Sequence, residues 1–241
     1  MNDIGQIDIG DIGLEGIGDI DIDLFDLEGE NYGAPTRYLK PKVYDVKASH
    51  VVYENAQALA RDLDFSANDR YDVFVSGNFI FGDFIEAFLV RNNVKCLSMT
   101  ISTLSLSQDN VDSLETLMAK GYIDALQLVV SGYFYAHEAR GLVQYMYRHL
   151  DIDNRFQLAV AAIHTKTCHF LTAGGKRIVI HGSANLRSSA NIEQFTIEDN
   201  AELFDFYEQH YDALIEKCAT INKPIPRGET WGVFTDKTTE Q

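Results

Sequence analysis

The 241-residue chain (27.1 kDa) contains 46% hydrophobic and 11% aromatic residues, enough for one substantial core or two small ones, which excludes collagen-like, mucin-like and coiled-coil chains. Its 36 acidic and 20 basic side chains give a formal net charge of -16 and a pI of about 4.7. This charge excludes a protein that coats nucleic acid through non-specific phosphate contacts, so any nucleic-acid site must be locally basic.

The first 36 residues differ from the rest of the chain, because they contain ten acidic residues, no Lys or Arg, and a loose repeat of Asp, Ile and Gly. Mutual repulsion of the carboxylates and the many glycines oppose a packed core. We therefore predict a largely disordered acidic arm over residues 1–36 and a folded domain over residues 37–241. Three roles fit the arm: a solubilising tail, a docking segment for a protein partner, and a phosphate mimic. As a mimic it would visit a basic pocket formed by Lys166, Lys176, Arg177 and Arg187.

From residue 43 onward, short apolar runs alternate with segments of helical periodicity, which is typical of an α/β chain. The predicted helices span residues 54–64, 83–91, 111–120, 138–149 and 202–217. The predicted strands span residues 71–76, 94–98, 125–130, 156–163, 167–171 and 177–180, with Gly174-Gly175 as a hairpin turn. We expect one mixed β-sheet flanked by helices on both faces.

The densest group of catalytic residue types lies between residues 164 and 193. Residues two apart in a strand share a face, so His164 and Lys166 should project together while Thr165 points into the opposite layer. Gly182-Ser183-Ala184-Asn185 follows an apolar strand, and its hydroxyl and amide groups are donors suited to phosphate oxygens.

This pattern resembles the signature of the phospholipase D superfamily, which is His-x-Lys, a strand hairpin and then Gly-Ser-x-Asn. The resemblance covers roughly residues 70–217 and includes Asn191-Ile192-Glu193, since nuclease-like members carry a similar Asn-x-Glu. The chain looks like the small single-motif proteins of bacteriophages and mobile elements, which implies the cytoplasm of a bacterial host cell. One position departs from the pattern, because the family's Asp five residues after the Lys is Leu171 here.

The resemblance implies a metal-independent phosphodiesterase, most simply a nuclease, without cofactors. His164 would attack phosphorus and form a phosphohistidine, while Lys166, Ser183 and Asn185 would bind the phosphate. Glu193 completes the implied catalytic set. A second histidine must protonate the leaving oxygen, and single-motif members obtain it from a homodimer. The expected substrate is nucleic acid, DNA rather than RNA, and no membrane partner is expected because no apolar docking segment is visible.

Leu171 leaves a second class open, a catalytically lapsed protein that keeps the phosphate pocket to bind nucleic acid or a partner. A zinc site of His164, Cys168, His169 and His181 is also conceivable, but adjacent strand residues such as Cys168 and His169 face opposite sides. The remaining cysteines form no C-x-x-C pair, and the chain has no signal peptide or apolar stretch of membrane-spanning length. These observations fit a reduced, cytoplasmic protein.

Overall fold

The computed structural model describes residues 47–53, 55–66, 69–75, 79–187 and 191–220. The predicted acidic arm lies outside these residues, so the division after residue 36 stays a prediction. The described strands are β1 (Ala48–Tyr53), β2 (Arg70–Val75), β3 (Cys96–Thr103), β4 (Leu126–Ser131), β5 (Phe156–Ala161), β6 (Thr167–Thr172), β7 (Arg177–Gly182) and β8 (Glu193–Asp199). The described helices are α1 (Ala56–Asp62), α2 (Phe81–Arg91), α3 (Gln108–Ala119), α4 (Gly132–Glu138), α5 (Leu142–Leu150) and α6 (Ala201–Cys218).

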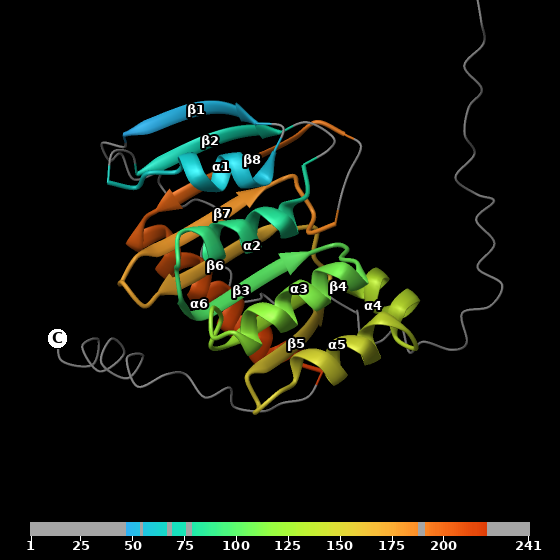
Figure 1. Ribbon diagram of the computed structural model, residues 1–241. Helices are drawn as coiled ribbons and strands as arrows, with labels where there is room; N and C mark the ends of the chain where they lie inside the picture. Colours follow the sequence, from blue (N-terminus) through green and yellow to red (C-terminus); the bar gives the residue numbers. More distant parts are fainter. Residues whose placement is uncertain (1–46, 54, 67–68, 76–78, 188–190, 221–241) are drawn as a thin grey trace, which may run out of the picture. The chain divides into compact units, whose positions relative to one another are not determined.

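The strands form one mixed sheet in the order β1-β2-β8-β7-β6-β3-β4-β5. The pairs β1–β2, β3–β4 and β4–β5 are parallel, whereas β8, β7 and β6 form an antiparallel centre. Helices α1 to α5 cover one face of the sheet and α6 lies on the other (Figure 1). The predicted α/β class, with a mixed sheet flanked by helices on both faces, is confirmed.

The two faces of the sheet bury different kinds of side chain. Beneath α1 to α5, apolar residues of the central strands meet a cluster of phenylalanines that includes Phe84, Phe88 and Phe195. Beneath α6 the contacts are fewer and more polar, with Phe204 and Tyr211 packed on the strands. In the part of the chain that the structure describes, no helix combines the length and apolar character that crossing a membrane requires.

Several elements begin earlier than predicted or were missed. Helix α3 starts at Gln108 because the Ser107 hydroxyl accepts from the Asn110 N–H, a cap that adds a turn before the apolar stretch. The helix predicted over residues 138–149 is wrong, because α4 and α5 are separate helices and Gly141 precedes the second.

Strands β1 and β8 were not predicted at all. The β1 residues are exposed or half-buried, as an edge strand allows, so the apolar pattern is weak. Strand β8 contains the acidic residue Glu198, which is buried 3.5 Å from Arg70. Because Arg70 is distant in the sequence, the local pattern does not indicate that an acidic residue is buried here.

Candidate active site

The β6–β7 hairpin brings the two motifs together at one edge of the sheet. Its turn contains Gly175, whose φ of +83° is a left-handed conformation suited to glycine, and the Gly175 N–H donates to the Thr172 carbonyl at 2.9 Å. The register pairs Thr167 with His181, and one position further the Gly182 N–H donates to the Lys166 carbonyl at 3.1 Å. The end of the His-x-Lys motif therefore lies directly beside the start of Gly-Ser-Ala-Asn.

Gly182 is required here by space rather than by backbone conformation. A Cβ at this position would lie 2.6 Å from the Phe195 Cα and 2.7 Å from the Phe195 Cβ. Strand β8 therefore packs against β7 so closely that no side chain fits, which explains the first residue of the Gly-Ser-x-Asn motif in this chain.

His164 and Lys166 lie in the segment that joins β5 to β6, outside both strands. The His164 side chain is exposed, Lys166 is partly exposed, and the Lys166 ammonium donates to the His164 carbonyl at 3.4 Å. Thr165 between them makes its side-chain contacts with β3 and α6, through Ser102 at 2.6 Å and Tyr211 at 3.0 Å. An exposed imidazole and an ammonium on one short segment can meet an anionic ligand from solvent.

Ser183 and Glu193 are joined directly. The Ser183 hydroxyl donates to the Glu193 carboxylate and accepts from the Gln194 N–H at 3.1 Å. The Ser183 N–H also donates to the Gln194 carbonyl at 2.9 Å, which extends the β7–β8 ladder by one residue. The structure thus places Glu193 as the residue that orients the Ser183 hydroxyl.

Asn185 is oriented from the other side, by the chain that follows β3. Its side-chain oxygen accepts from the Leu104 N–H at 3.3 Å. The Thr103 hydroxyl lies 3.4 Å from the same oxygen, but the Ser105 carbonyl is the closer acceptor for its single proton, at 3.0 Å. Because the oxygen is occupied in this way, the amide NH₂ group points its donors away from these partners. It can therefore serve an acceptor such as a phosphate oxygen.

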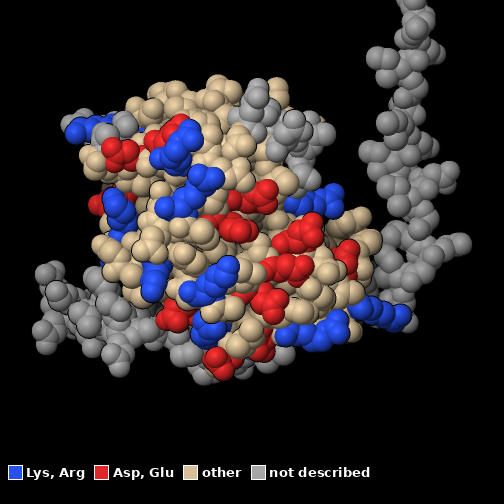
Figure 2. All heavy atoms as spheres, viewed as in Figure 1, with Lys and Arg blue, Asp and Glu red and all other residues tan. Residues whose placement is uncertain are grey.

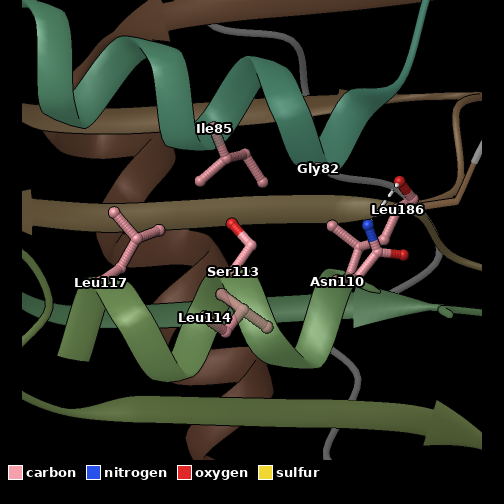
Figure 3. A pocket seen from close by; sticks show the side chains of 7 residues that line it. All are labelled: Gly82, Ile85, Asn110, Ser113, Leu114, Leu117 and Leu186. Atoms are coloured by element: carbon pink, nitrogen blue, oxygen red, sulfur yellow. Dashed lines mark hydrogen bonds between the residues drawn. The ribbon is translucent and has the colours of Figure 1, made fainter. Parts of the chain in front are cut away.

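The residue after the motif is anchored between α2 and α3, beside a small pocket whose lining side chains are drawn in Figure 3. The Leu186 carbonyl accepts from the Gly82 N–H at 3.0 Å and from the Asn110 amide at 3.4 Å (Figure 3). A Cβ on Gly82 would lie 2.5 Å from the Asn110 Nδ2, so this glycine allows the close approach. The pocket is lined by Gly82, Ile85, Asn110, Ser113, Leu114, Leu117 and Leu186.

The basic pocket predicted around Lys166 is wrong for Lys176 and Arg177. Lys176 and Arg177 lie at the turn of the hairpin, the opposite end of β6 and β7 from Lys166, so they cannot belong to one pocket with it. They form ion pairs with Asp199 at 2.8 Å and Asp205 at 2.7 Å. Proximity in the sequence was misleading because an antiparallel strand carries consecutive residues away from the site.

Charge on the face covered by α1 to α5 is mixed. Figure 2 shows acidic side chains gathered over the middle of this face, with basic side chains around them. Burial, together with the nearby carboxylates of Glu86 and Asp109, raises the pKa of Asp83 above its ordinary value. An anionic ligand would therefore be repelled from this part of the face, in contrast to the edge that carries Lys166.

Leu171, which stands where the family pattern has Asp, is buried beneath α6 with Val179 and Phe204. It lies five residues beyond Lys166 along an extended strand, a distance of about 16 Å. The substitution therefore fills an apolar cluster and removes no group from the neighbourhood of Lys166.

The residues considered for zinc do not converge. Cys168 packs in the core beneath α1 to α5, while His169 faces α6, as expected for neighbours in a strand. Burial raises the pKa of the Cys168 thiol and lowers that of His169 to about 3. Across the described ranges, no three His, Cys, Asp or Glu side chains are placed to hold a metal ion together.

A polar group next to the site went unnoticed in the sequence. Glu198 is 4% exposed and lies 4.0 Å from His181, the residue before Gly182, and 3.1 Å from the Asn200 amide. Burial alone would raise the pKa of Glu198, but His181, Asn200 and the charge of Arg70 outweigh it and hold the pKa below its ordinary value. No local motif marks this residue, because its partners come from other strands.

No family model matches the sequence, and no curated protein matches it either. Among solved structures, the chain is similar to Nuc from Salmonella typhimurium, a phospholipase D family member, with 15% identity and a TM-score of 0.39 over 52% of this chain and 81% of that one. The fold is similar to that of a phospholipase D family member.

Two further solved structures are similar to this chain. NucT from Helicobacter pylori matches with 15% identity and a TM-score of 0.42 over 63% of this chain and 99% of that one. Polyphosphate kinase from Porphyromonas gingivalis matches with 12% identity and a TM-score of 0.46 over 69% of this chain. The chain spans only 30% of the length of that kinase.

Proposed function

We propose that the protein is a metal-independent phosphodiesterase that cleaves nucleic acid, with DNA as the expected substrate. The observation that supports this most directly is the convergence of Lys166, Ser183, Asn185 and Glu193 at the end of one hairpin, next to an exposed His164. A nucleophile, a cation and two neutral donors are the groups that phosphodiester cleavage requires.

In the proposed reaction, a neutral nitrogen of His164 attacks phosphorus, and the bond from phosphorus to the leaving oxygen breaks. Lys166 and the Asn185 amide offset the negative charge that develops on the phosphate oxygens. The Ser183 hydroxyl donates to Glu193, so it would have to turn in order to donate to a phosphate oxygen. Water then opens the phosphohistidine and regenerates the imidazole.

The leaving oxygen needs a proton, and in the proposal a second copy of His164 supplies it from a homodimer. This assignment follows from the single His-x-Lys motif in the chain. Light scattering should then give a mass near twice 27.1 kDa. A strictly monomeric protein that still cleaves would contradict the shared site.

The second candidate is a lapsed enzyme that binds nucleic acid or a partner, and the observation that favours it is Leu171. Leu171 lies about 16 Å along the strand from Lys166, so the presence of Leu in place of Asp at this position leaves the site intact. We therefore place the active phosphodiesterase first.

The test is cleavage of single- and double-stranded DNA in EDTA by the wild-type protein, by His164→Ala and by His137→Ala, an exposed histidine on α4 that serves as control. The proposal expects cleavage by the wild type and the control and its loss in His164→Ala. Cleavage that EDTA abolishes would overturn the histidine mechanism. DNA binding without cleavage, weakened by Lys166→Ala, would favour the lapsed enzyme.

A further inference from the structure

The segment that carries His164 and Lys166 has little backbone support of its own. Residues 163–166 lie between β5 and β6, where the Ile163 N–H donates to the Ala161 carbonyl at 2.9 Å and the Lys166 carbonyl accepts from Gly182 at 3.1 Å. Between these two bonds the segment is held mainly through the side chain of Thr165.

Hydroxyl groups of β3, β6 and α6 form a chain of hydrogen bonds with the Thr165 hydroxyl. The Thr167 hydroxyl donates to the Tyr211 hydroxyl at 2.9 Å, and the Tyr211 hydroxyl donates to the Thr165 Oγ1 at 3.0 Å. The Ser102 hydroxyl donates to the Thr165 carbonyl at 3.3 Å, and its oxygen lies 2.6 Å from the Thr165 Oγ1.

The direction of two of these hydrogen bonds is set, because each hydroxyl has one proton. Thr167 donates to Tyr211, so the Tyr211 proton is left for the Thr165 Oγ1. In the short contact between Ser102 and Thr165, either hydroxyl can donate. The chain of hydroxyl groups therefore ends at Thr165, the residue between His164 and Lys166.

Tyr211 is fixed in the interior of the protein. It is 3% exposed on α6, and its ring stacks on His169 with centroids 5.6 Å apart. Ser102 and Thr167 are also buried, whereas Thr165 lies at the surface. Fixed hydroxyl groups in the interior therefore hold an exposed residue in the middle of the candidate motif.

We propose that Tyr211 is a positioning residue, which holds the backbone of Thr165 and through it sets the placement of His164 and Lys166. The catalytic part of this inference rests on the proposed function, whereas the hold on the segment does not. Misplacement of reacting groups by about 1 Å can lower rates by up to about a hundredfold, so loss of one hydroxyl at this point should be visible in kcat.

The experiment compares Tyr211→Phe with Tyr207→Phe, which is one turn earlier on α6. The Tyr207 ring also packs on His169, but its hydroxyl makes no hydrogen bond within the described ranges. The reporter is the exchange of the Gly182 amide proton, measured by NMR, because its acceptor is the Lys166 carbonyl. The Gly175 amide, at the other end of the hairpin, is the internal control.

The proposal expects Gly182 exchange to be about tenfold faster in Tyr211→Phe, with Gly175 unchanged and Tyr207→Phe like the wild type. It also expects kcat for DNA to fall about tenfold with KM nearly unchanged. Thr165→Val should reproduce both effects and replaces Tyr211→Phe if that variant does not fold.

Unchanged Gly182 exchange in Tyr211→Phe and in Thr165→Val would overturn the proposal. Faster exchange with an unchanged kcat in an active enzyme would also overturn it as a positioning role. If the wild-type protein cleaves nothing, the proposed function fails, and Gly182 exchange still decides whether Tyr211 holds the segment.

Discussion

The two ends of the β6–β7 hairpin are both basic, but they use their cations differently. At the turn, Lys176 and Arg177 are neutralised by Asp199 and Asp205 at 2.8 and 2.7 Å. At the open end, the Lys166 ammonium contacts a backbone carbonyl at 3.4 Å and forms no ion pair with a carboxylate of the described residues. A paired cation supports the fold, whereas one that meets only a carbonyl can still bind an anion.

The glycines at the two ends differ in the space available for a side chain. A Cβ on Gly182 would collide with the backbone of β8 at 2.6 Å, whereas a Cβ on Gly174 would make an ordinary contact with the Thr172 hydroxyl at 3.8 Å. The end that carries the motif is therefore tightly packed in its backbone and open in its side chains. At the turn, a Cβ fits on Gly174, and the charged side chains are held in ion pairs.

The largest effect, on kcat, should distinguish Lys166→Ala from Lys176→Ala. Under the proposed function, Lys166→Ala should lower kcat for DNA about 10²- to 10³-fold, because it removes the charge assigned there to transition-state stabilisation. Lys176→Ala should leave kcat within about twofold, since its partner is Asp199 at the far end. Steady-state cleavage assays in EDTA measure both.

Thermal unfolding serves as the control for the lysine pair. Neither variant should lower stability by more than about 1 kcal/mol, because both side chains are partly exposed. Equal losses of activity in Lys166→Ala and Lys176→Ala would contradict the difference between the two ends.

A smaller effect, on stability, should separate the two glycines. Gly182→Ala should destabilise the fold by about 2–3 kcal/mol, because β7 and β8 must move apart. Gly174→Ala should change stability by no more than about 0.5 kcal/mol. Both replacements restrict the unfolded chain alike, so the difference in urea unfolding reports the steric clash. Similar stabilities would show that β8 can shift freely.

The meeting of the two motifs could be predicted from the sequence because it depends on local rules. Lys166 and Gly182 each lie eight residues from Gly174, so a hairpin that turns there places them side by side. Short apolar strands on either side of a double glycine were enough to establish this part of the site.

The surroundings of the site could not be predicted, because they depend on contacts distant in the sequence. Tyr211 reaches Thr165 across 46 residues, and the buried Glu198 lies beside Arg70 and His181, which come from other strands. Lys176 and Arg177 were predicted near Lys166 because they are close to it in the sequence, but the hairpin places them at its turn, far from its open end. Side-chain type and spacing do not encode these distances.

Between the two ends lies His169, in the middle of β6, and it should produce the smallest effect at neutral pH. Its ring is buried against Tyr211 and Phe204, its Nδ1 has no hydrogen-bond partner within the described ranges, and burial lowers its pKa from 6.5 to about 3. The unfolded chain therefore binds a proton below pH 6.5 that the folded protein does not bind.

The sign follows from this difference in proton binding: His169 has no pH-dependent effect above pH 6.5, and each pH unit below it lowers the free energy of unfolding by about 1.4 kcal/mol. In His169→Phe this slope should disappear from urea unfolding between pH 6.5 and 5, a window above the titration of most carboxylates. His137→Gln, at an exposed position, should keep the wild-type slope. An unchanged slope in His169→Phe would mean that His169 binds a proton as readily in the folded protein as in the unfolded chain.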